Sequence, residues 1–383
     1  MNIAYFINSL GDAAGMERII IDKANLLSER PGINVFIVSL VAYSAEKPAF
    51  EVSPRVSVIN IDRVFDPGGI SPARRPFTFL RRWLKWRRGL RKTVDKVIRD
   101  HHIDIAITYT YNASYPIDTD TCHAIVESHA YRRDTVQDSA MPAIRRHLTS
   151  RRVADADALV ALTEADAALW HEARRVEVIG NFTNIRPAAP YRPDTKRIMA
   201  AGRINSQKGF DILVEAWRIV RRRHPDWSLD IYGGPLDSAL ATDLQSRINE
   251  ADMSHCVTLC GICHDMPQAY AAHSAFVLSS RYEGFGLVLL EAMTCGLPCV
   301  TFDCPCGPSD IVTDGDDGFV VPFAGRSDTQ RAEQLADGLC RIIDAGDEGR
   351  LRMSEAAVRN AARFSPSATI DRWVALFNDI VNR

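Results

Sequence analysis

The sequence AFVLSSRYEGFGLVLLEAM, at residues 275–293, decides the fold because it passes from a strand through a glycine turn directly into a helix. Residues 275–278 are apolar and strand-like, and the glycines let the backbone approach a ligand closely. The N–H groups that open the helix have no intrahelical partners and favour an anion such as phosphate. Glu283 lies in the loop, and Glu291 falls about two turns into the helix. On this window alone, a surface helix after a Gly-x-Gly turn is an equal alternative.

The pair Glu283 and Glu291, in the pattern Glu-x7-Glu, resembles the signature of glycosyltransferase family 4, a retaining family with the GT-B fold. AGRINSQKGFDIL at residues 201–213 resembles the family's Gly-Arg-x4-Lys-Gly segment, and residues 296–312 resemble its next strand and loop. The resemblance implies an α/β protein with two tandem Rossmann-like, doubly wound parallel sheets facing a central cleft. It also implies a C-terminal helix that crosses back to the first domain.

Length and composition agree with a two-domain enzyme. The chain has 383 residues, too many for one ordinary core, and 46% hydrophobic with 25% charged residues is typical of a globular enzyme. A formal net charge of −2 gives no general attraction to nucleic acid. The start of the sequence lacks a basic leader, and no window approaches the roughly 20 apolar residues of a spanning helix. We therefore expect no signal peptide and a cytoplasmic location.

Alternating strand and helix patterns predict the domain boundaries. Residues 1–185 should form an N-terminal acceptor-binding domain, and the proline-rich residues 186–195 a linker. Residues 196–365 should form the domain that binds the nucleotide sugar, and residues 366–383 the returning helix. That helix carries Trp373, Leu376 and Phe377 on one face. Ligands of such open sheets bind at the carboxyl ends of the strands.

The predicted elements alternate throughout both domains. Helices are expected at residues 16–28, 77–101, 142–154, 210–223, 285–294 and 367–381. Strands are expected at residues 1–7, 34–39, 56–59, 103–108, 124–127, 158–161, 176–182, 197–201, 229–232, 256–259, 275–278, 299–302 and 319–321.

Breaking a sugar–diphosphate bond leaves charge on two phosphates, so the site needs cations or oriented dipoles where that charge develops. Arg203 and Lys208 should lie in the loop after the strand that ends near Ala201. The resemblance implies that both bind the leaving diphosphate, and a solvated basic loop is the alternative. With two cations and two helix starts available, we expect no metal site and no cofactor, because the nucleotide sugar is itself the substrate.

Two candidate residues belong to the first domain. Gly15 opens the first helix after a loop that lacks the Gly-x-Gly-x-x-Gly of a Rossmann dehydrogenase, and a plain glycine turn is the alternative. His129 follows a strand and resembles the family's active-site histidine, which hydrogen-bonds the transferred sugar; a purely structural histidine is the alternative. The resemblance implies front-face attack, with the diphosphate oxygen accepting the acceptor's proton and Glu283 orienting the donor sugar.

The resemblance assigns the remaining roles residue by residue. The residues implied in catalysis are His129, Arg203, Lys208 and Glu283. The residues implied in donor binding are Gly15, Arg203, Lys208, Glu283, Phe285, Gly286, Leu287, Val288 and Glu291.

A basic helix with aromatic residues is typical of a segment that lies on an anionic membrane surface. No acid occurs between Asp66 and Asp95, whereas arginines and tryptophans accumulate there. The residues expected to contact membrane or acceptor are Arg81, Arg82, Trp83, Trp86, Arg87 and Arg88. The segment could equally grip the pyrophosphate of a lipid-linked acceptor, or pack its aromatic residues inward as a solvated helix. The neutral overall balance argues against nucleic acid.

The nine cysteines are expected to be free thiols. The densest group, with Cys256, Cys260 and Cys263, reads as a strand entering a loop rather than as the paired ligands of a zinc site.

These observations predict a retaining, metal-independent hexosyltransferase on the inner face of the cell membrane. Residues 302–309 look like the branch of the family that uses UDP-hexoses or UDP-N-acetylhexosamines, so UDP is favoured over GDP. The expected partners are the donor, a growing lipid-linked surface glycan as acceptor, and anionic membrane. One alternative is a GT-B sugar-nucleotide epimerase or hydrolase that acts without an acceptor, and a second is a non-catalytic binding subunit.

Overall fold

The chain folds into two compact units in the computed structural model. Unit 1 comprises Met1–Asn181 and Pro366–Arg383, and unit 2 comprises Phe182–Ser365. The structure describes residues 1–11, 15–40, 49–61, 74–110, 116–117, 119–129, 132, 142–236 and 238–383.

The segment expected to link the domains, residues 186–195, lies within unit 2 and packs on it. The Tyr191 hydroxyl donates to the carbonyl of Ser274 at 2.7 Å. The Arg350 guanidinium donates to the carbonyl of Pro193 at 3.1 Å. Unit 2 begins at Phe182, and these hydrogen bonds anchor the proline-rich segment to it.

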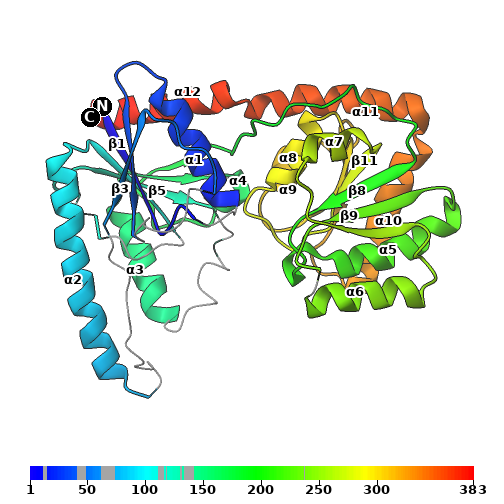
Figure 1. Ribbon diagram of the computed structural model, residues 1–383, viewed down its shortest axis with the longest axis horizontal. Helices are drawn as coiled ribbons and strands as arrows, with labels where there is room; N and C mark the ends of the chain where they lie inside the picture. Colours follow the sequence, from blue (N-terminus) through cyan, green and yellow to red (C-terminus); the bar gives the residue numbers. More distant parts are fainter. Residues whose placement is uncertain are drawn as a thin grey trace. The chain divides into compact units, whose positions relative to one another are not determined.

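Unit 1 is built on a seven-stranded parallel sheet with the order β3-β2-β1-β4-β5-β6-β7 (Figure 1). Its central strands are buried along almost their whole length because a parallel sheet is covered on both faces, whereas the edge strand at residues 56–60 is largely exposed. The strands are β1 (Asn2–Ile7), β2 (Asn34–Ser39), β3 (Val56–Asn60), β4 (Ile105–Tyr109), β5 (His123–Ser128), β6 (Ala158–Ala161) and β7 (Val176–Val178). The helices are α1 (Gly15–Ser28), α2 (Pro76–Asp100), α3 (Pro142–Asp155), α4 (Glu164–Ala167) and α12 (Pro366–Val381).

The last helix, α12, returns to unit 1 as predicted. Its apolar face is buried through Trp373, Leu376 and Phe377. Asp371 on its outer side pairs with Arg30, just after α1, at 2.6 Å. The helix therefore belongs to the first unit although it follows the second in sequence.

Unit 2 is built on a six-stranded parallel sheet with the order β10-β9-β8-β11-β12-β13. The strands are β8 (Arg197–Ala201), β9 (Ser228–Tyr232), β10 (Val257–Gly261), β11 (Ala275–Leu278), β12 (Cys299–Asp303) and β13 (Gly318–Pro322). The α-helices are α5 (Phe210–Arg223), α6 (Ala239–Glu250), α7 (Met266–Ala271), α8 (Leu287–Thr294), α9 (Pro308–Ile311), α10 (Asp328–Asp344) and α11 (Gly346–Ala361), with 3₁₀ turns η2 (Ser206–Lys208) and η3 (Ala362–Phe364).

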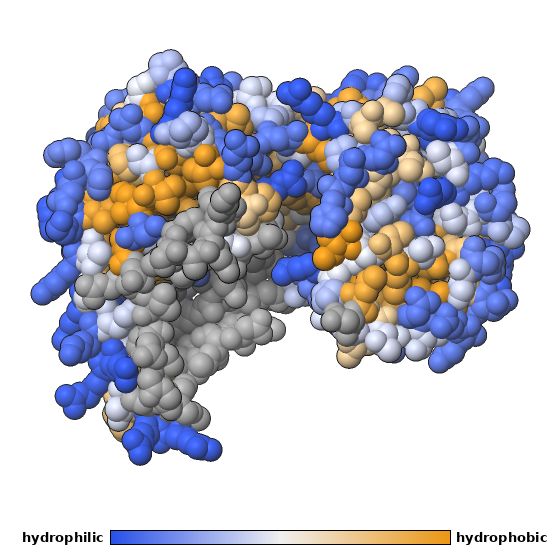
Figure 2. All heavy atoms as spheres, viewed as in Figure 1, coloured by the Kyte–Doolittle hydropathy of each residue, from blue (hydrophilic) through white to orange (hydrophobic). Residues whose placement is uncertain are grey.

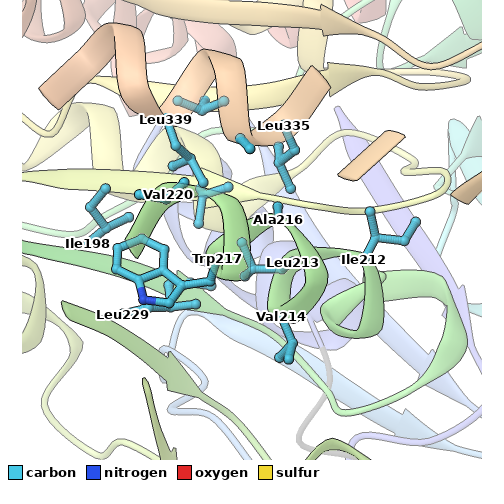
Figure 3. Close-up of a cluster of buried hydrophobic side chains, with 14 of the residues drawn as sticks. Ile198, Ile212, Leu213, Val214, Ala216, Trp217, Val220, Leu229, Leu335 and Leu339 are labelled. Atoms are coloured by element: carbon cyan, nitrogen blue, oxygen red, sulfur yellow. The ribbon is translucent and has the colours of Figure 1, made fainter. Parts of the chain in front are cut away.

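The core of unit 2 lies between α5, α10 and the sheet. Trp217 of α5 is fully buried there with Leu229 of β9 and Leu339 of α10. Figure 3 shows these side chains gathered with their apolar neighbours. The amphipathic spacing along α5 places this apolar stripe on the sheet and thereby fixes the loop that precedes the helix.

Several predicted boundaries differ from the observed ones by one or more residues, among them the start of α8 and the end of β7. Helix α8 begins at Leu287 rather than at residue 285, because Gly286 adopts a left-handed φ of 95° and serves as the N-cap. Glu291 is consequently the fifth residue of the helix, about one turn from its start instead of two. Strand β7 ends at Val178 rather than at residue 182, and Phe182 already belongs to unit 2.

Candidate functional site

The strand order of unit 2 reverses between β8 and β11, which are hydrogen-bonded neighbours with Ala275 opposite Ile198. Open α/β sheets bind ligands at such a switch point, outside the carboxyl ends of the strands, because the two following loops diverge there. The loops at this point are residues 202–209, after β8, and residues 279–286, after β11. These loops contain the two motifs singled out in the sequence.

Lys208 and Glu283 meet across these loops. Lys208 Nζ lies 2.7 Å from Glu283 Oε1, and the Ser280 hydroxyl donates to the same oxygen at 2.5 Å. Both side chains are largely buried, with 13% of Lys208 and 7% of Glu283 exposed. Glu283 is therefore held as an acceptor by one cation and one hydroxyl at the switch point.

Backbone contacts fix the two loops to each other. The Arg281 amide donates to the Gln207 carbonyl at 2.8 Å, and the Ser279 hydroxyl donates to the Lys208 carbonyl at 2.8 Å. Gly209 has a left-handed φ of 62°, and a Cβ there would lie 2.2 Å from the carbonyl oxygen of Ser279. Only glycine allows this close approach, which explains the Lys-Gly pair of the motif.

Arg281 fastens the same loops to the helices behind them. Its guanidinium donates to both carboxylate oxygens of Asp211 in α5, at 2.9 and 2.7 Å, and to Asp328 in α10 at 2.8 Å. A bidentate pair of this kind fixes orientation as well as position. The loop carrying Glu283 is therefore braced from its far side.

Arg203 differs from Lys208 in its surroundings. It lies exposed in the loop after β8. Within the described part of the chain, its guanidinium makes no hydrogen bond or ion pair. It therefore supplies a positive charge that is not neutralised by a neighbouring carboxylate.

The start of α8 presents unpaired backbone donors. Gly286 provides no side-chain cap, and the helix ladder begins with the Leu289 amide donating to the Gly286 carbonyl at 2.8 Å. The amides of Leu287 and Val288 precede that bond, so they have no intrahelical acceptor. Phe285 is buried and packs edge-on against Phe364, at 5.4 Å between ring centroids, which anchors the turn.

Glu291 is buried one turn further along α8, with 4% exposed. The Tyr270 hydroxyl donates to its Oε2 at 3.2 Å and lies 3.3 Å from the Val288 carbonyl. Burial, followed by the charge of Glu291, raises the pKa of Tyr270 well above its usual value. Tyr270 therefore stays a neutral donor that holds the carboxylate.

In unit 1, the strand order reverses between β1 and β4, and Gly15 is the first residue of α1 after β1. No described atom would lie within 4 Å of a Cβ at this position. Sterics therefore do not require glycine there, in contrast to Gly209.

His129 follows β5 and is held by a buried carboxylate. Its Nε2 lies 2.8 Å from Glu127 Oε2, and its ring packs edge-on against Tyr109 of β4 at 5.6 Å. Lys23 of α1 contacts the same Glu127 oxygen at 2.5 Å. Sequence reasoning missed Glu127 and Lys23. The available signal was a lysine between Ile19 and Leu27 on the apolar stripe of α1.

The basic helix α2 has two distinct halves. Its second half is anchored through Leu90 and Val94 in the core of unit 1, and Trp86 packs partly buried against the same core. Phe77 at the other end is 82% exposed. Figure 2 shows hydrophilic side chains along this helix, at the left of the view. The residues Arg81, Arg82 and Arg88 are exposed, whereas Trp83 and Arg87 are half-buried and contact each other at 5.5 Å.

A cavity of about 450 Å³ opens elsewhere on unit 2, among α5, α6 and α10. Its charged lining includes Asp211 and Asp328, which are already paired with Arg281, and Arg218, which pairs with Glu215. Several of the lining charges are thus already paired, and the switch-point loops, which contain both sequence motifs, remain the better candidate.

No helix in the described ranges combines the length and apolarity needed to cross a bilayer. Likewise, no group of three histidine, cysteine or acidic side chains in those ranges is arranged to hold a metal ion. None of the nine cysteines, all of which lie in the described ranges, forms a disulfide, and Cys260 lies within β10.

Comparison with known proteins follows the same division of the chain. Residues 195–345, within unit 2, match the family described as Glycosyl transferases group 1. An uncharacterized glycosyltransferase from Haemophilus influenzae is 24% identical over 97% of this chain and 98% of its own. The amylovoran biosynthesis glycosyltransferase AmsD from Erwinia amylovora is 29% identical over 59% of this chain and 62% of its own.

A solved structure covers both units. Sucrose-phosphate synthase from Thermosynechococcus elongatus matches with a TM-score of 0.76 at 19% identity, over 99% of each chain. Two tandem parallel-sheet units with α12 returning to the first, together with this likeness, confirm the predicted GT-B fold. Taken with the matched family and the relatives, this architecture supports a GT-B glycosyltransferase family for the chain.

Proposed function

We propose that the protein is a retaining glycosyltransferase of family 4 that moves a hexose or N-acetylhexosamine from a nucleotide diphosphate sugar to a hydroxyl of a growing glycan. The observation that carries the proposal is the contact of Lys208 with Glu283 at the switch point of the second sheet. It joins the two motifs of the sequence in the place where open α/β sheets bind nucleotides.

The donor would lie along the carboxyl edge of the unit 2 sheet. Arg203 and the amides of Leu287 and Val288 supply a cation and oriented dipoles for the diphosphate. Glu291, buried one turn into α8, would accept hydrogen bonds from the two ribose hydroxyls. Glu283 would orient the sugar, because its position is fixed by Lys208 and Ser280.

The proposed reaction proceeds on one face of the sugar. The bond between the anomeric carbon and the β-phosphate oxygen breaks, and a bond to the acceptor oxygen forms on the same face, so configuration is retained. The acceptor's proton passes to the departing β-phosphate oxygen. Arg203 and Lys208 then offset the charge of the leaving diphosphate, which is the role that other transferases give to a metal ion.

The choice of UDP over GDP rests on a different part of the chain. Glu291 would hold the ribose of any nucleotide, so it does not select the base. Residues 302–309, which span the end of β12 and the start of α9, resemble the branch of the family that uses UDP-sugars. Gly307 in this stretch lies so close to Phe285 that a Cβ would be 2.6 Å from its carbonyl oxygen. The stretch is therefore packed directly against the turn that carries the donor-binding motif.

The acceptor is proposed to be a lipid-linked glycan at the cytoplasmic face of the membrane. The Erwinia relative is named for amylovoran biosynthesis, which supports a glycan product. The first half of α2 offers an exposed phenylalanine, Phe77, beside the exposed Arg81 and Arg82. Aromatic and basic side chains together favour an anionic lipid surface. Trp86 packs partly buried against the core of unit 1, so the proposal relies on Phe77 and the exposed arginines instead.

A ligand screen tests the proposal. Thermal shifts would be measured with UDP, GDP, ADP and their sugars, because a ligand that binds only the native state raises the melting temperature. We expect the largest shift with UDP or a UDP-sugar, and an NMR spectrum of the released or transferred sugar should show retained anomeric configuration. No shift with any nucleotide would remove the proposed donor site, and inverted product would remove the retaining mechanism.

A further inference from the structure

Unit 1 contains a buried chain of side chains that ends at His129. Lys23 of α1 is 2% exposed and Glu127 of β5 is 0% exposed, yet they form an ion pair at 2.5 Å. Trp373 of α12 covers Lys23, whose Nζ lies 4.3 Å from the ring centroid. The same Glu127 oxygen that contacts Lys23 also contacts His129 Nε2, at 2.8 Å. These four residues, which come from α12, α1, β5 and the loop after β5, thus contact one another in sequence from Trp373 to His129.

Stability alone does not explain this pair. A buried ion pair is often no more stabilising than apolar residues of similar volume, because both charges lose their hydration. Glu127 Oε1 accepts no hydrogen bond within the described residues, so the carboxylate is not even fully satisfied. The pair occupies positions on the apolar faces of α1 and β5 that aliphatic side chains would fill. A role beyond packing is therefore indicated.

The charge state of Glu127 determines which nitrogen of His129 carries a proton. Burial alone would raise the pKa of Glu127, but the charge of Lys23 and the hydrogen bonds from His129 and Lys23 outweigh it and lower that pKa to about 2. An ionised carboxylate only accepts hydrogen bonds, so Nε2 of His129 must be the protonated nitrogen. Nδ1 of the neutral ring is then left as an acceptor.

We infer that Lys23, Glu127 and Trp373 are positioning residues that fix His129 in the Nε2-protonated tautomer and offer its Nδ1 to a hydroxyl of the transferred sugar. The inference rests on the proposed function and on the role that the family resemblance implies for His129, a hydrogen bond to that sugar. Lys23 balances the carboxylate, so that the ring need not become an imidazolium to do so. Trp373 closes over Lys23, which gives the returning helix α12 a part in the site.

Two phenols among the described residues face Lys23 and His129. Tyr5 of β1 faces Lys23, with 5.6 Å between Nζ and the ring centroid, and Tyr109 of β4 faces His129. Burial, with a further contribution from the charge of Glu127, raises the pKa of Tyr5 well above its usual value, so Tyr5 stays neutral. Tyr5 therefore adds no charge beside Lys23 and Glu127.

The test follows the His129 ring nitrogens by ¹⁵N NMR of histidine-labelled protein, with signals assigned by their loss in His129→Gln. Wild type should show an unprotonated Nδ1 and a protonated Nε2. In Lys23→Met the carboxylate loses its cation, so the ¹⁵N signals of His129 and the pH–rate profile should both differ from those of wild type. Because this variant leaves the buried Glu127 carboxylate without its cation, a second variant, Lys23→Met/Glu127→Gln, removes both charges of the pair.

The double variant should fold, show a mixture of His129 tautomers, and lose turnover by on the order of 10- to 100-fold, as for other histidines that lose an orienting carboxylate. Its affinity for UDP should equal that of wild type. Arg30→Met is the matched control, since it breaks the exposed pair with Asp371 of α12. It leaves the contacts from Trp373 through Lys23 and Glu127 to His129 intact. Wild-type ¹⁵N signals and an unchanged pH–rate profile in the folded double variant would overturn the inference. Failure of wild type to bind any nucleotide would instead count against the proposed function, and the ¹⁵N signals would still decide the tautomer.

Discussion

Lys208 Nζ and Glu283 Oε1 lie 2.7 Å apart, although 75 residues separate them in sequence. The contact joins the loop after β8 to the loop after β11, the two neighbouring strands at which the order of the second sheet reverses. Because Gly209 and Arg281 brace the same loops, the pair is held in place by the fold rather than by its own attraction. Its position makes it the reference point for the predictions that follow.

Glu291→Ala should weaken UDP binding by roughly 10- to 150-fold, because hydrogen bonds to a charged group contribute about 1.5–3 kcal/mol. Tyr270→Phe is the matched control: it removes one donor to Glu291 but keeps the carboxylate, so it should cost less than tenfold. Titration calorimetry measures both. Equal UDP affinity in Glu291→Ala and wild type would show that this carboxylate does not hold the ribose.

Turnover of the UDP-sugar should be unchanged by excess chelator. The proposed site offsets the charge of the leaving diphosphate with Arg203, Lys208 and the start of α8, so no step needs a divalent cation. Release of UDP would be followed with and without EDTA, and again after adding Mg²⁺ or Mn²⁺. An absolute requirement for either metal would show that these cations and dipoles are insufficient.

Replacing Arg81, Arg82, Arg87 and Arg88 by serine should release the protein from anionic vesicles at low salt. Each basic residue near such a surface contributes on the order of 1 kcal/mol, and the contribution should fade as salt is added. Transfer to a lipid-linked acceptor should slow, whereas UDP affinity should stay the same. Vesicle co-sedimentation and calorimetry measure these two quantities.

The second half of α2 provides a control of equal charge. Arg91, Lys92, Lys96 and Arg99 are exposed, and two of them face acids of the same helix, Asp95 at 3.9 Å and Asp100 at 2.7 Å. Serine at these four positions should leave most vesicle binding intact. Equal losses in both quadruple variants would mean that general charge, and not the exposed first half of the helix, attracts the protein. Absence of binding by wild type would leave the acceptor soluble.

Acid should destabilise unit 1 through Glu127. Its pKa is lowered from 4.5 to about 2 in the folded protein, so its contribution is fully present above pH 4.5 and is lost as the pH falls through 2. That contribution is on the order of 3 kcal/mol of unfolding free energy. In Lys23→Met/Glu127→Gln this part of the pH dependence should be missing. Denaturant unfolding between these pH values measures the difference, and parallel curves for variant and wild type would refute it.

Much of the fold could be predicted from the sequence because its signals are local. Buried parallel strands such as β2 and β11 are short apolar runs bounded by turn residues, and α5 follows its amphipathic period from Phe210 to Arg223. The start of α8 was misplaced by two residues because the left-handed backbone at Gly286 is set by the packing of the turn. The helix propensity of the sequence gives no indication of that constraint.

The contacts of the site could not be predicted, because they join residues that are distant in sequence. Spacing singled out Lys208 and Glu283 separately, but their pairing depends on the order of the strands. Neither Lys23 nor Glu127, which are 104 residues apart, was predicted as a site residue from the sequence. Trp86 was predicted to contact membrane or acceptor because charge surrounds it, and only the packing of α2 shows that it lies partly buried against the core. Gly15, His129, Arg203 and the α8 residues keep their roles as predictions.

The most direct test of the account compares UDP binding by wild type, Lys208→Met and Lys196→Met in one set of calorimetric titrations. Lys208 lies after the carboxyl end of β8, at the switch point, whereas Lys196 stands at the amino end of the same strand and pairs with Asp226 at 2.6 Å. We predict that Lys208→Met weakens UDP binding by roughly 10-fold or more, as expected for a lost charge-assisted bond, and that Lys196→Met leaves it unchanged. Equal affinity in all three proteins would contradict a donor site at the Lys208 and Glu283 loops.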